Sequence, residues 1–307
     1  MTIKAQIEVV GLGQCSLDIL GQLESYPKLD QKAELSSLLL QGGGPVATAL
    51  VTLARLGVSV AMFGAVGDDH FGQEIQDDLI AEGVDCTFLT KDSGCTSQAA
   101  FIAVDGQGHR NIFWHRGNAV PDVTALYEAL LSRAVKVLHL DGLHLMPAIA
   151  AAKIARSLNV VTVLDAGTMR PGLERLLPLI DHLVVSENFA GQIFGRHDPE
   201  AALRFLAGYG AAGVTITCGE SGSMSIDKTG SVFYQQAFAM DVVDTTGCGD
   251  VFHGGYIYGL LQGWEIRQTV RFAAACAALK TRALGGRTAI PDLPSVEAFL
   301  RTGCACT

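Results

Sequence analysis

Seven residues near the end of the chain combine two carboxylates with hydroxyl groups and glycines at close spacing. They read Asp244-Thr245-Thr246-Gly247-Cys248-Gly249-Asp250. Because glycine has no Cβ, Gly247 and Gly249 allow a tight turn in which main-chain N–H groups can approach an anion closely. A helix that begins here would point its unpaired N–H donors and the positive end of its dipole toward the same anion. The segment therefore predicts an anion site at residues 247–249, suited to a phosphate group that gains charge in a transition state.

Asp250, the last residue of this segment, has two interpretations. A carboxylate beside a phosphate site can act as a general base that takes a proton from an attacking hydroxyl group. An isolated aspartate at a helix N-terminus is more often a cap. The helix dipole should lower the pKa of this carboxyl group, which a base tolerates when its proton is removed late in the reaction. The complete pattern of seven residues favours the catalytic interpretation.

The composition excludes several classes of protein. The chain has 307 residues, of which 49% are hydrophobic and 17% are charged, so it predicts a folded protein rather than a disordered one. Its formal net charge is −9 and it has no run of Lys or Arg, which argues against a nucleic-acid partner. The eight cysteines include no Cys-x-x-Cys pair, which is typical of reduced thiols in the cytoplasm.

Two apolar stretches could be a signal peptide or a membrane-spanning helix, but neither has the pattern of such a segment. Residues 1–10 carry two charges and only a short apolar run, unlike a signal peptide. Residues 35–54 carry no charge, but Gly42-Gly43-Gly44-Pro45 interrupts them. We expect a loop followed by a buried helix here, in a cytoplasmic protein without a membrane contact.

Short apolar strands alternate with helices along most of the chain, which indicates an α/β protein with a parallel sheet covered on both faces. Strands are expected at residues 7–13, 58–63, 135–140, 160–164, 182–185 and 214–217. Helices are expected at residues 45–56, 69–82, 147–158, 172–180 and 199–209. Residues 17–40 and 97–115 break this rhythm with hairpin-like segments, the second around a turn at 105–108. They predict a small separate sheet, placed as a lid that excludes water from a site below it.

Five segments carry a resemblance to a known family. They are Asp18 after the first strand and the glycine-containing segments 42–49, 64–72, 217–222 and 244–250. In this order and spacing, the chain resembles the ribokinase-like (PfkB) carbohydrate kinases over essentially its whole length. The resemblance implies one domain over residues 1–307, an α/β three-layer sandwich with a mostly parallel central sheet and a small β-sheet lid. Segments 14–41 and 96–117 would form the lid.

The resemblance implies ATP-dependent phosphorylation of a hydroxyl group on a small sugar or sugar derivative. Asp250 matches the catalytic base, and the anion hole for the γ-phosphoryl group is matched by Gly247, Cys248 and Gly249. The positions next to the sugar are matched by Asp18, Gly42, Gly43 and Asn118. The positions on the nucleotide side are matched by Glu187, Thr217, Gly219 and Gly222.

The resemblance also implies ligands and partners besides the sugar. ATP and Mg²⁺ are expected, and Asp244, Thr246 and the loop at 285–287 match the place where relatives often bind a monovalent cation such as K⁺. Lid strands of relatives often pair between subunits, which implies a homodimer through the lid.

Two segments depart from the usual family pattern. Ala47 stands where many relatives have Asn, which removes one hydrogen bond to the sugar. Where many relatives have Asn-x-x-Glu, this chain has Ser186 in place of the Asn and Phe189 in place of the final Glu, and only Glu187 remains of the usual Asn-Glu pair. This puts the usual route to magnesium and phosphate in doubt. Gly42-Gly43-Gly44-Pro45 together with Asp241-Val242-Val243-Asp244 and Gly285-Gly286-Arg287 is most similar to the sulfofructose kinase branch.

Two further side chains have both a functional and a structural interpretation. Arg170 follows a predicted strand on the side where α/β proteins bind ligands, so it could bind an anionic group of the substrate or the nucleotide, or lie free on the surface. His253 lies one turn after Asp250 and is expected to belong to the core.

Three other functions remain open from the sequence. The same scaffold supports a nucleoside kinase, which would need an aromatic clamp from Phe101, Phe113 or Trp114. A sugar or nucleotide sensor without catalysis is the second, and the altered segment 186–189 leaves room for it. A dinucleotide-dependent dehydrogenase is the least favoured, because Gly11-x-Gly13 is followed by Ser16 in place of the third glycine.

Overall fold

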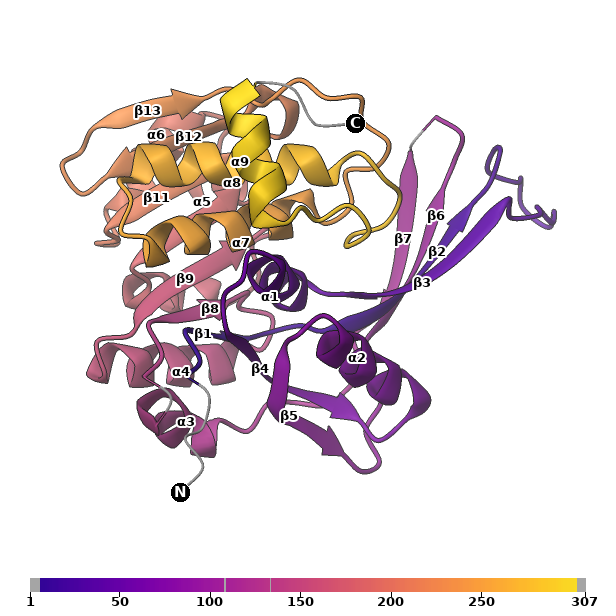
Figure 1. Ribbon diagram of the computed structural model, residues 1–307, viewed down its shortest axis with the longest axis horizontal. Helices are drawn as coiled ribbons and strands as arrows, with labels where there is room; N and C mark the ends of the chain where they lie inside the picture. Colours follow the sequence, from indigo (N-terminus) through magenta and orange to yellow (C-terminus); the bar gives the residue numbers. More distant parts are fainter. Residues whose placement is uncertain (1–5, 108, 133, 303–307) are drawn as a thin grey trace.

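A large twisted sheet with helices on both faces forms the body of the molecule (Figure 1). The computed structural model describes residues 6–302 except 108 and 133. Within these residues nine strands form the sheet, in the order β13-β12-β11-β10-β9-β8-β1-β4-β5. All neighbours are parallel except the pairs β11–β12 and β12–β13. The strands are β1 (Val9–Leu12), β4 (Val60–Gly67), β5 (Asp85–Asp92), β8 (Val137–Leu140), β9 (Val161–Ala166), β10 (His182–Ser186), β11 (Gly213–Thr217), β12 (Ser223–Asp227) and β13 (Val232–Gln235).

The two faces of this sheet belong to two separate apolar clusters. Successive residues of a strand point to opposite faces, and Val9 lies in one cluster whereas Val10 lies in the other. The first face is covered by α1 (Pro45–Arg55), α2 (His70–Ala81), α7 (Cys248–Leu261), α8 (Ile266–Lys280) and α9 (Leu293–Thr302). The second is covered by α3 (Leu126–Ser132), α4 (Leu145–Ser157), α5 (Glu187–Phe194) and α6 (Pro199–Ala207). The α/β three-layer arrangement expected from the sequence is confirmed.

A second, four-stranded sheet extends away from the body (Figure 1). Its order is β3-β2-β6-β7, and only β2 and β6 are parallel. The strands are β2 (Ser16–Gln22), β3 (Ser37–Gly43), β6 (Ala99–Val104) and β7 (Arg110–His115). Leu20, Ile102 and Val104 form its own small core. The hairpin-like segments expected from the sequence therefore do form a separate sheet.

The structure corrects one predicted helix and several element ends. Residues 172–180 form two short 3₁₀ helices, η2 (Leu173–Arg175) and η3 (Leu177–Leu179), instead of one α-helix. Pro178 lacks an N–H donor and cannot continue a regular helix. Two further 3₁₀ turns are η1 (Val123–Ala125) and η4 (Gly219–Ser221). The turn predicted at 105–108 ends at Gly108, which lies outside the described residues.

The uncharged stretch at 35–54 forms β3 and most of α1. Among the residues that the structure describes, no helix is both long and apolar enough to cross a membrane.

Close contact between α1 and α7 fixes the helix that begins at Cys248. The two helices approach at Gly254, where a Cβ atom would lie 2.6 Å from Thr52 Cβ and 2.9 Å from the main-chain oxygen of Ala49. Real Cβ atoms do not approach other atoms so closely, so any larger side chain at this position must push the helices apart.

We expect Gly254→Val to lower the free energy of unfolding by roughly 1–3 kcal/mol, because it overpacks a tight helix contact. Urea denaturation followed by circular dichroism measures the change. Gly191→Ala is the matched control, because a Cβ atom in that helix would meet nothing closer than Arg196 O at 3.9 Å. A Gly254→Val protein as stable as the wild type would contradict this description of the contact.

Candidate active site

Four carboxyl groups from distant parts of the chain gather where the parallel strands end. Asp18 lies in β2, Asp141 directly follows β8, Asp165 lies in β9, and Asp250 lies in the first turn of α7. The charges of the first three all act on Asp250. The carboxyl ends of the strands in an open α/β sheet are the usual place for ligands, so this cluster marks the candidate site.

The first turn of α7 presents main-chain donors at this cluster. Gly247 is the residue before the helix and has φ 74°, a left-handed conformation that favours glycine. A Cβ atom there would also lie 2.8 Å from Gly286 O. In the part of the chain that the structure describes, the amides of Gly249 and Asp250 find no oxygen acceptor. The amide of Cys248 donates to Thr245 O at 3.2 Å, so this predicted donor already has an internal partner.

The pKa of Asp250 is raised, not lowered. Burial is the largest cause, followed by the charges of Asp165 and Asp18, and Arg287 opposes them. The sequence-based expectation of a lowered pKa is therefore wrong. A helix dipole acts only at close range, and here desolvation and neighbouring carboxylates outweigh it.

His253 links this turn to the sheet. Its Nδ1 lies 2.7 Å from Gly249 O and 3.3 Å from Asp165 Oδ2, and its Nε2 lies 3.0 Å from Val184 O. The side chain is buried, as expected from the sequence. Its polar contacts, however, fix the peptide that precedes Asp250, which the expectation of a core residue missed.

The two glycines at the end of β3 lie against Asp18 and Arg287. A Cβ atom on Gly43 would lie 2.2 Å from Asp18 Oδ2, and one on Gly42 would lie 2.1 Å from Arg287 Nη1. Arg287 is buried, donates to Gly43 O at 3.0 Å and pairs with Asp78. Burial raises the pKa of Asp18. The structure thus brings Asp18, Gly42 and Gly43 together, with Arg287 fixing the glycine backbone.

Asn118 and Arg170 have different surroundings. Asn118 Oδ1 accepts from the amide of Thr96 at 2.7 Å and its own amide donates to Thr96 O at 3.1 Å, which ties two loops of the small sheet together. Arg170 is half-buried, and its guanidinium group has no hydrogen-bond partner among the described residues. Burial lowers its pKa, and the nearby charges of Asp141 and Asp165 oppose this.

The residues predicted on the nucleotide side lie at the ends of β10 and β11. Thr217 ends β11, and Gly219 and Gly222 form the following turn with φ 56° and 91°. A Cβ atom on Gly222 would lie 2.1 Å from Gln235 O, so this glycine is also required by packing. Glu187 begins α5.

The unusual segment 186–189 has a structural explanation. Ser186 Oγ accepts from the amide of Phe189 at 3.0 Å and so caps α5. Phe189 is fully buried in the core, where a carboxylate could not replace it without a large desolvation cost.

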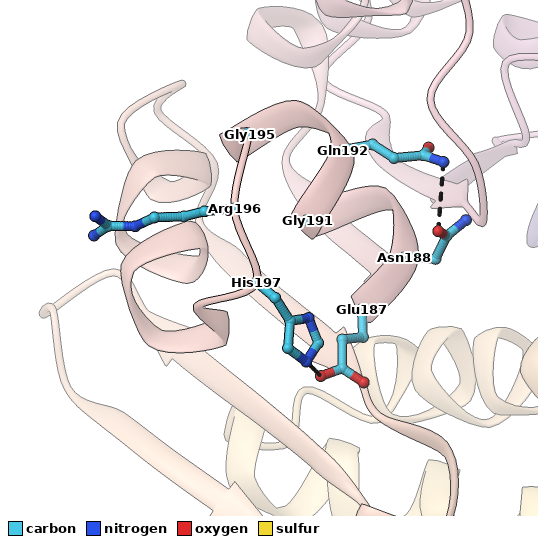
Figure 2. Close-up of a pocket in the computed structure, with 7 residues that line it drawn as sticks. All are labelled: Glu187, Asn188, Gly191, Gln192, Gly195, Arg196 and His197. Atoms are coloured by element: carbon cyan, nitrogen blue, oxygen red, sulfur yellow. Dashed lines mark hydrogen bonds and ion pairs between the residues drawn. The ribbon is translucent and has the colours of Figure 1, made fainter.

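Glu187 also borders an open cavity of about 620 Å³ beside α5. Figure 2 shows its carboxylate facing His197, with Nε2 and Oε1 3.1 Å apart, while Arg196 points away.

The carboxylate of Asp244 accepts three hydrogen bonds. Its Oδ1 accepts from the amide and the hydroxyl group of Thr246, both at 2.8 Å, and its Oδ2 accepts from the amide of Gly285 at 2.8 Å. The structure therefore brings Asp244 together with Thr246 and the loop at 285–287, as the sequence indicated.

The chain belongs to the pfkB family of carbohydrate kinases, whose family model matches residues 6–293. Among curated proteins it is similar to a ribokinase of Bacillus subtilis, with 28% identity over 94% of this chain and 98% of the relative. Kinase activity on a carbohydrate is thus the property that defines the family to which the chain belongs.

Solved structures share the fold over nearly the whole chain. A putative ribokinase from Agrobacterium tumefaciens has a TM-score of 0.91 and 26% identity, covering 98% of this chain and 99% of that one. A putative ribokinase II from E. coli, solved in complex with ATP and Mg²⁺, has a TM-score of 0.81 and 22% identity, covering 96% of this chain and 99% of that one. The fold is ribokinase-like.

The raised pKa of Asp250 generates a prediction about pH. A base must be deprotonated to act, so kcat/KM should fall on the acid side at a pH above the pKa of an ordinary aspartate. Asp165→Asn removes the neighbouring charge that raises the pKa of Asp250 most after burial, and should move this acid limb to lower pH. Steady-state rates of ADP formation across pH give the profile. An unmoved or upward-shifted limb would show that Asp165 does not act on the titrating group.

Proposed function

We propose that this pfkB-family kinase transfers the γ-phosphoryl group of ATP to a hydroxyl group of a small sugar, with Asp250 as the general base. One observation carries the proposal: the Asp250 carboxylate belongs to the same helix turn as the amides of Gly249 and Asp250, which find no oxygen acceptor among the described residues. A base and an anion site are thereby placed within one rigid element.

The proposed reaction divides its tasks between the two ends of the site. Asp18 and the backbone of Gly42 and Gly43 would bind sugar hydroxyls and present one of them to Asp250. The raised pKa of Asp250 suits it to take the proton of that hydroxyl group as the oxygen attacks phosphorus. The amides of Gly249 and Asp250, with that of Gly247 beside them, would stabilise the charge on the transferring group.

The nucleotide would lie at the ends of β10 and β11, next to Thr217, Gly219, Gly222 and Glu187. The complex of the E. coli relative with ATP and Mg²⁺ supports this choice of phosphate donor. Mg²⁺ usually binds through substrate phosphates, waters and one or two carboxylates. Glu187 is a carboxylate at this end that fits such an ion, whereas the buried Phe189 does not. When bound, Mg²⁺ would neutralise charge on the phosphates of ATP.

The small sheet, made from segments 14–41 and 96–117, would act as the lid. Arg110 of β7 donates to Thr245 at 2.5 Å, so the lid reaches the loop that carries Asp250. Closure over a bound sugar would exclude water, to which the phosphoryl group could otherwise be lost.

The acceptor is a small sugar or sugar derivative in this proposal. The surroundings of Arg170 indicate what charge this acceptor carries. This guanidinium group lies near the site and has no hydrogen-bond partner within the described part of the chain, which suits an acceptor that carries an anionic group. A nucleoside acceptor has less support, because the candidate clamp residues Phe101, Phe113 and Trp114 are exposed on the lid. Reduced cysteines and the use of ATP favour a cytoplasmic enzyme.

We expect Asp250→Asn to fold normally and bind ATP, but to lose about 10²- to 10⁴-fold in kcat because the base is removed. ADP formation should be measured against neutral, acidic, phosphorylated and sulfonated hexoses and against nucleosides. Asp198→Asn, which changes another aspartate at a helix N-terminus, is the matched control and should keep full activity.

Two outcomes would contradict the proposed function. An Asp250→Asn protein with unchanged turnover would remove Asp250 as the base. A wild-type protein that binds ATP and sugar without forming ADP would instead be a sensor.

We also propose a homodimer through the lid. Strand β7 is exposed along its whole length, with Phe113 62% exposed, and Leu38 and Leu40 of β3 are exposed as well. Exposed apolar strands at the edges of a sheet usually have a partner. We expect a dimer in light scattering and a monomer for Phe113→Lys, whereas Ile80→Lys on α2 should remain dimeric. A monomeric wild type, or a dimeric Phe113→Lys protein, would contradict this interface.

A further inference from the structure

The cation that relatives often bind beside the anion hole does not fit the residues of this chain. The three hydrogen bonds to its carboxylate leave Asp244 committed to Thr246 and Gly285. Its main-chain oxygen, the other acceptor it could offer to a metal ion, lies 2.9 Å from Lys280 Nζ. A metal cation bound here would be repelled by the positive charge of the Lys280 ammonium group.

Lys280 is unusual because its whole side chain is buried. It is the last residue of α8 and has 0% exposure. Lysine is almost never fully buried unless its charge is paired. Here the ammonium group donates to Asp244 O, and the nearby charges of Asp244, Cys248 and Asp250 oppose the lowering of its pKa by burial. The neighbours of Lys280 are thus the loop and the helix turn that form the proposed anion hole.

Lys280 therefore meets the requirements for a built-in cation. An ammonium group is a compact positive charge with three N–H donors. Because it is attached to the chain through its side chain, it cannot dissociate into solvent as a bound ion can. It fixes the Asp244 carbonyl group from one side, while the amides of Val243 and Asp244 donate to Thr281 O at 2.8 and 3.1 Å. The loop before α7 is thus attached to the end of α8 at three points.

We infer that the ammonium group of Lys280 takes the place of the monovalent cation, positions the loop 244–246 beside the anion hole, and makes the enzyme independent of K⁺. The inference concerns the regulation of the proposed kinase site and rests on that function only for its activity readout. Lys280 is a positioning residue in this account, because it acts through the loop and not on the substrate.

The experiment compares K⁺ with tetramethylammonium, which is too large for such a site, at equal ionic strength. Wild-type ADP formation and melting temperature should be the same in both salts. Lys280→Met should lose about tenfold or more of kcat in tetramethylammonium, because the anion hole loses its support. K⁺ or NH₄⁺ should restore part of this loss and raise the melting temperature of the variant, since an ion that binds the folded state stabilises it.

The surface lysine Lys136, which pairs with Glu8, provides the control, and Lys136→Met should respond to neither cation. Activation of the wild-type enzyme by K⁺, or a rise of its melting temperature specific to K⁺, would overturn the inference even if Lys280→Met did not fold. A folded Lys280→Met protein with full activity in tetramethylammonium would overturn it as well. If no acceptor supports ADP formation, the proposed kinase activity fails, and the melting temperatures still test the cation site.

Discussion

The orientation of one helix turn is the constraint on which the rest of the site depends. The first turn of α7 carries both the carboxylate that we assign as the base and the amides of residues 249–250, for which the described residues provide no oxygen acceptor. Each group is useful only if the other faces the same point in space, because an in-line transfer needs the acceptor oxygen and the phosphorus centre side by side. Placing both on consecutive residues of a packed helix provides this geometry without a separate positioning element.

Three buried basic side chains fix the backbone around this turn. His253 contacts Gly249 O one turn earlier in the same helix, and Lys280 contacts Asp244 O in the loop before it. Arg287 contacts Gly43 O at the proposed sugar site. All three bond to main-chain carbonyl oxygens. Burial and the carboxylates of Asp165 and Asp18 meanwhile raise the pKa of Asp250, so the base keeps affinity for a proton. Arg287 takes part in both functions, because it fixes the backbone of Gly43 and its charge opposes the raised pKa of Asp250.

The sequence predicted what depends on local chemistry. Alternating apolar strands and helices predicted the α/β class, and segment 244–250 indicated a helix beginning within it, which the structure starts at Cys248. It did not predict the pKa of Asp250, because Asp165 lies 85 positions earlier in the chain and meets it only in the fold. The same holds for Lys280, whose burial depends on the packing of α8 against α7. Asp141 and Asp165 could have been predicted as site residues from the sequence, because both lie at the carboxyl ends of buried strands.

A crystal structure with ADP, aluminium fluoride and an accepted sugar tests the central claim most directly, because the fluoride complex imitates the transferring phosphoryl group. The account predicts fluoride ligands within hydrogen-bonding distance of the amides of Gly249 and Asp250, with the Asp250 carboxylate facing the acceptor oxygen. A complex bound elsewhere, or an acceptor oxygen out of reach of that carboxylate, would contradict it.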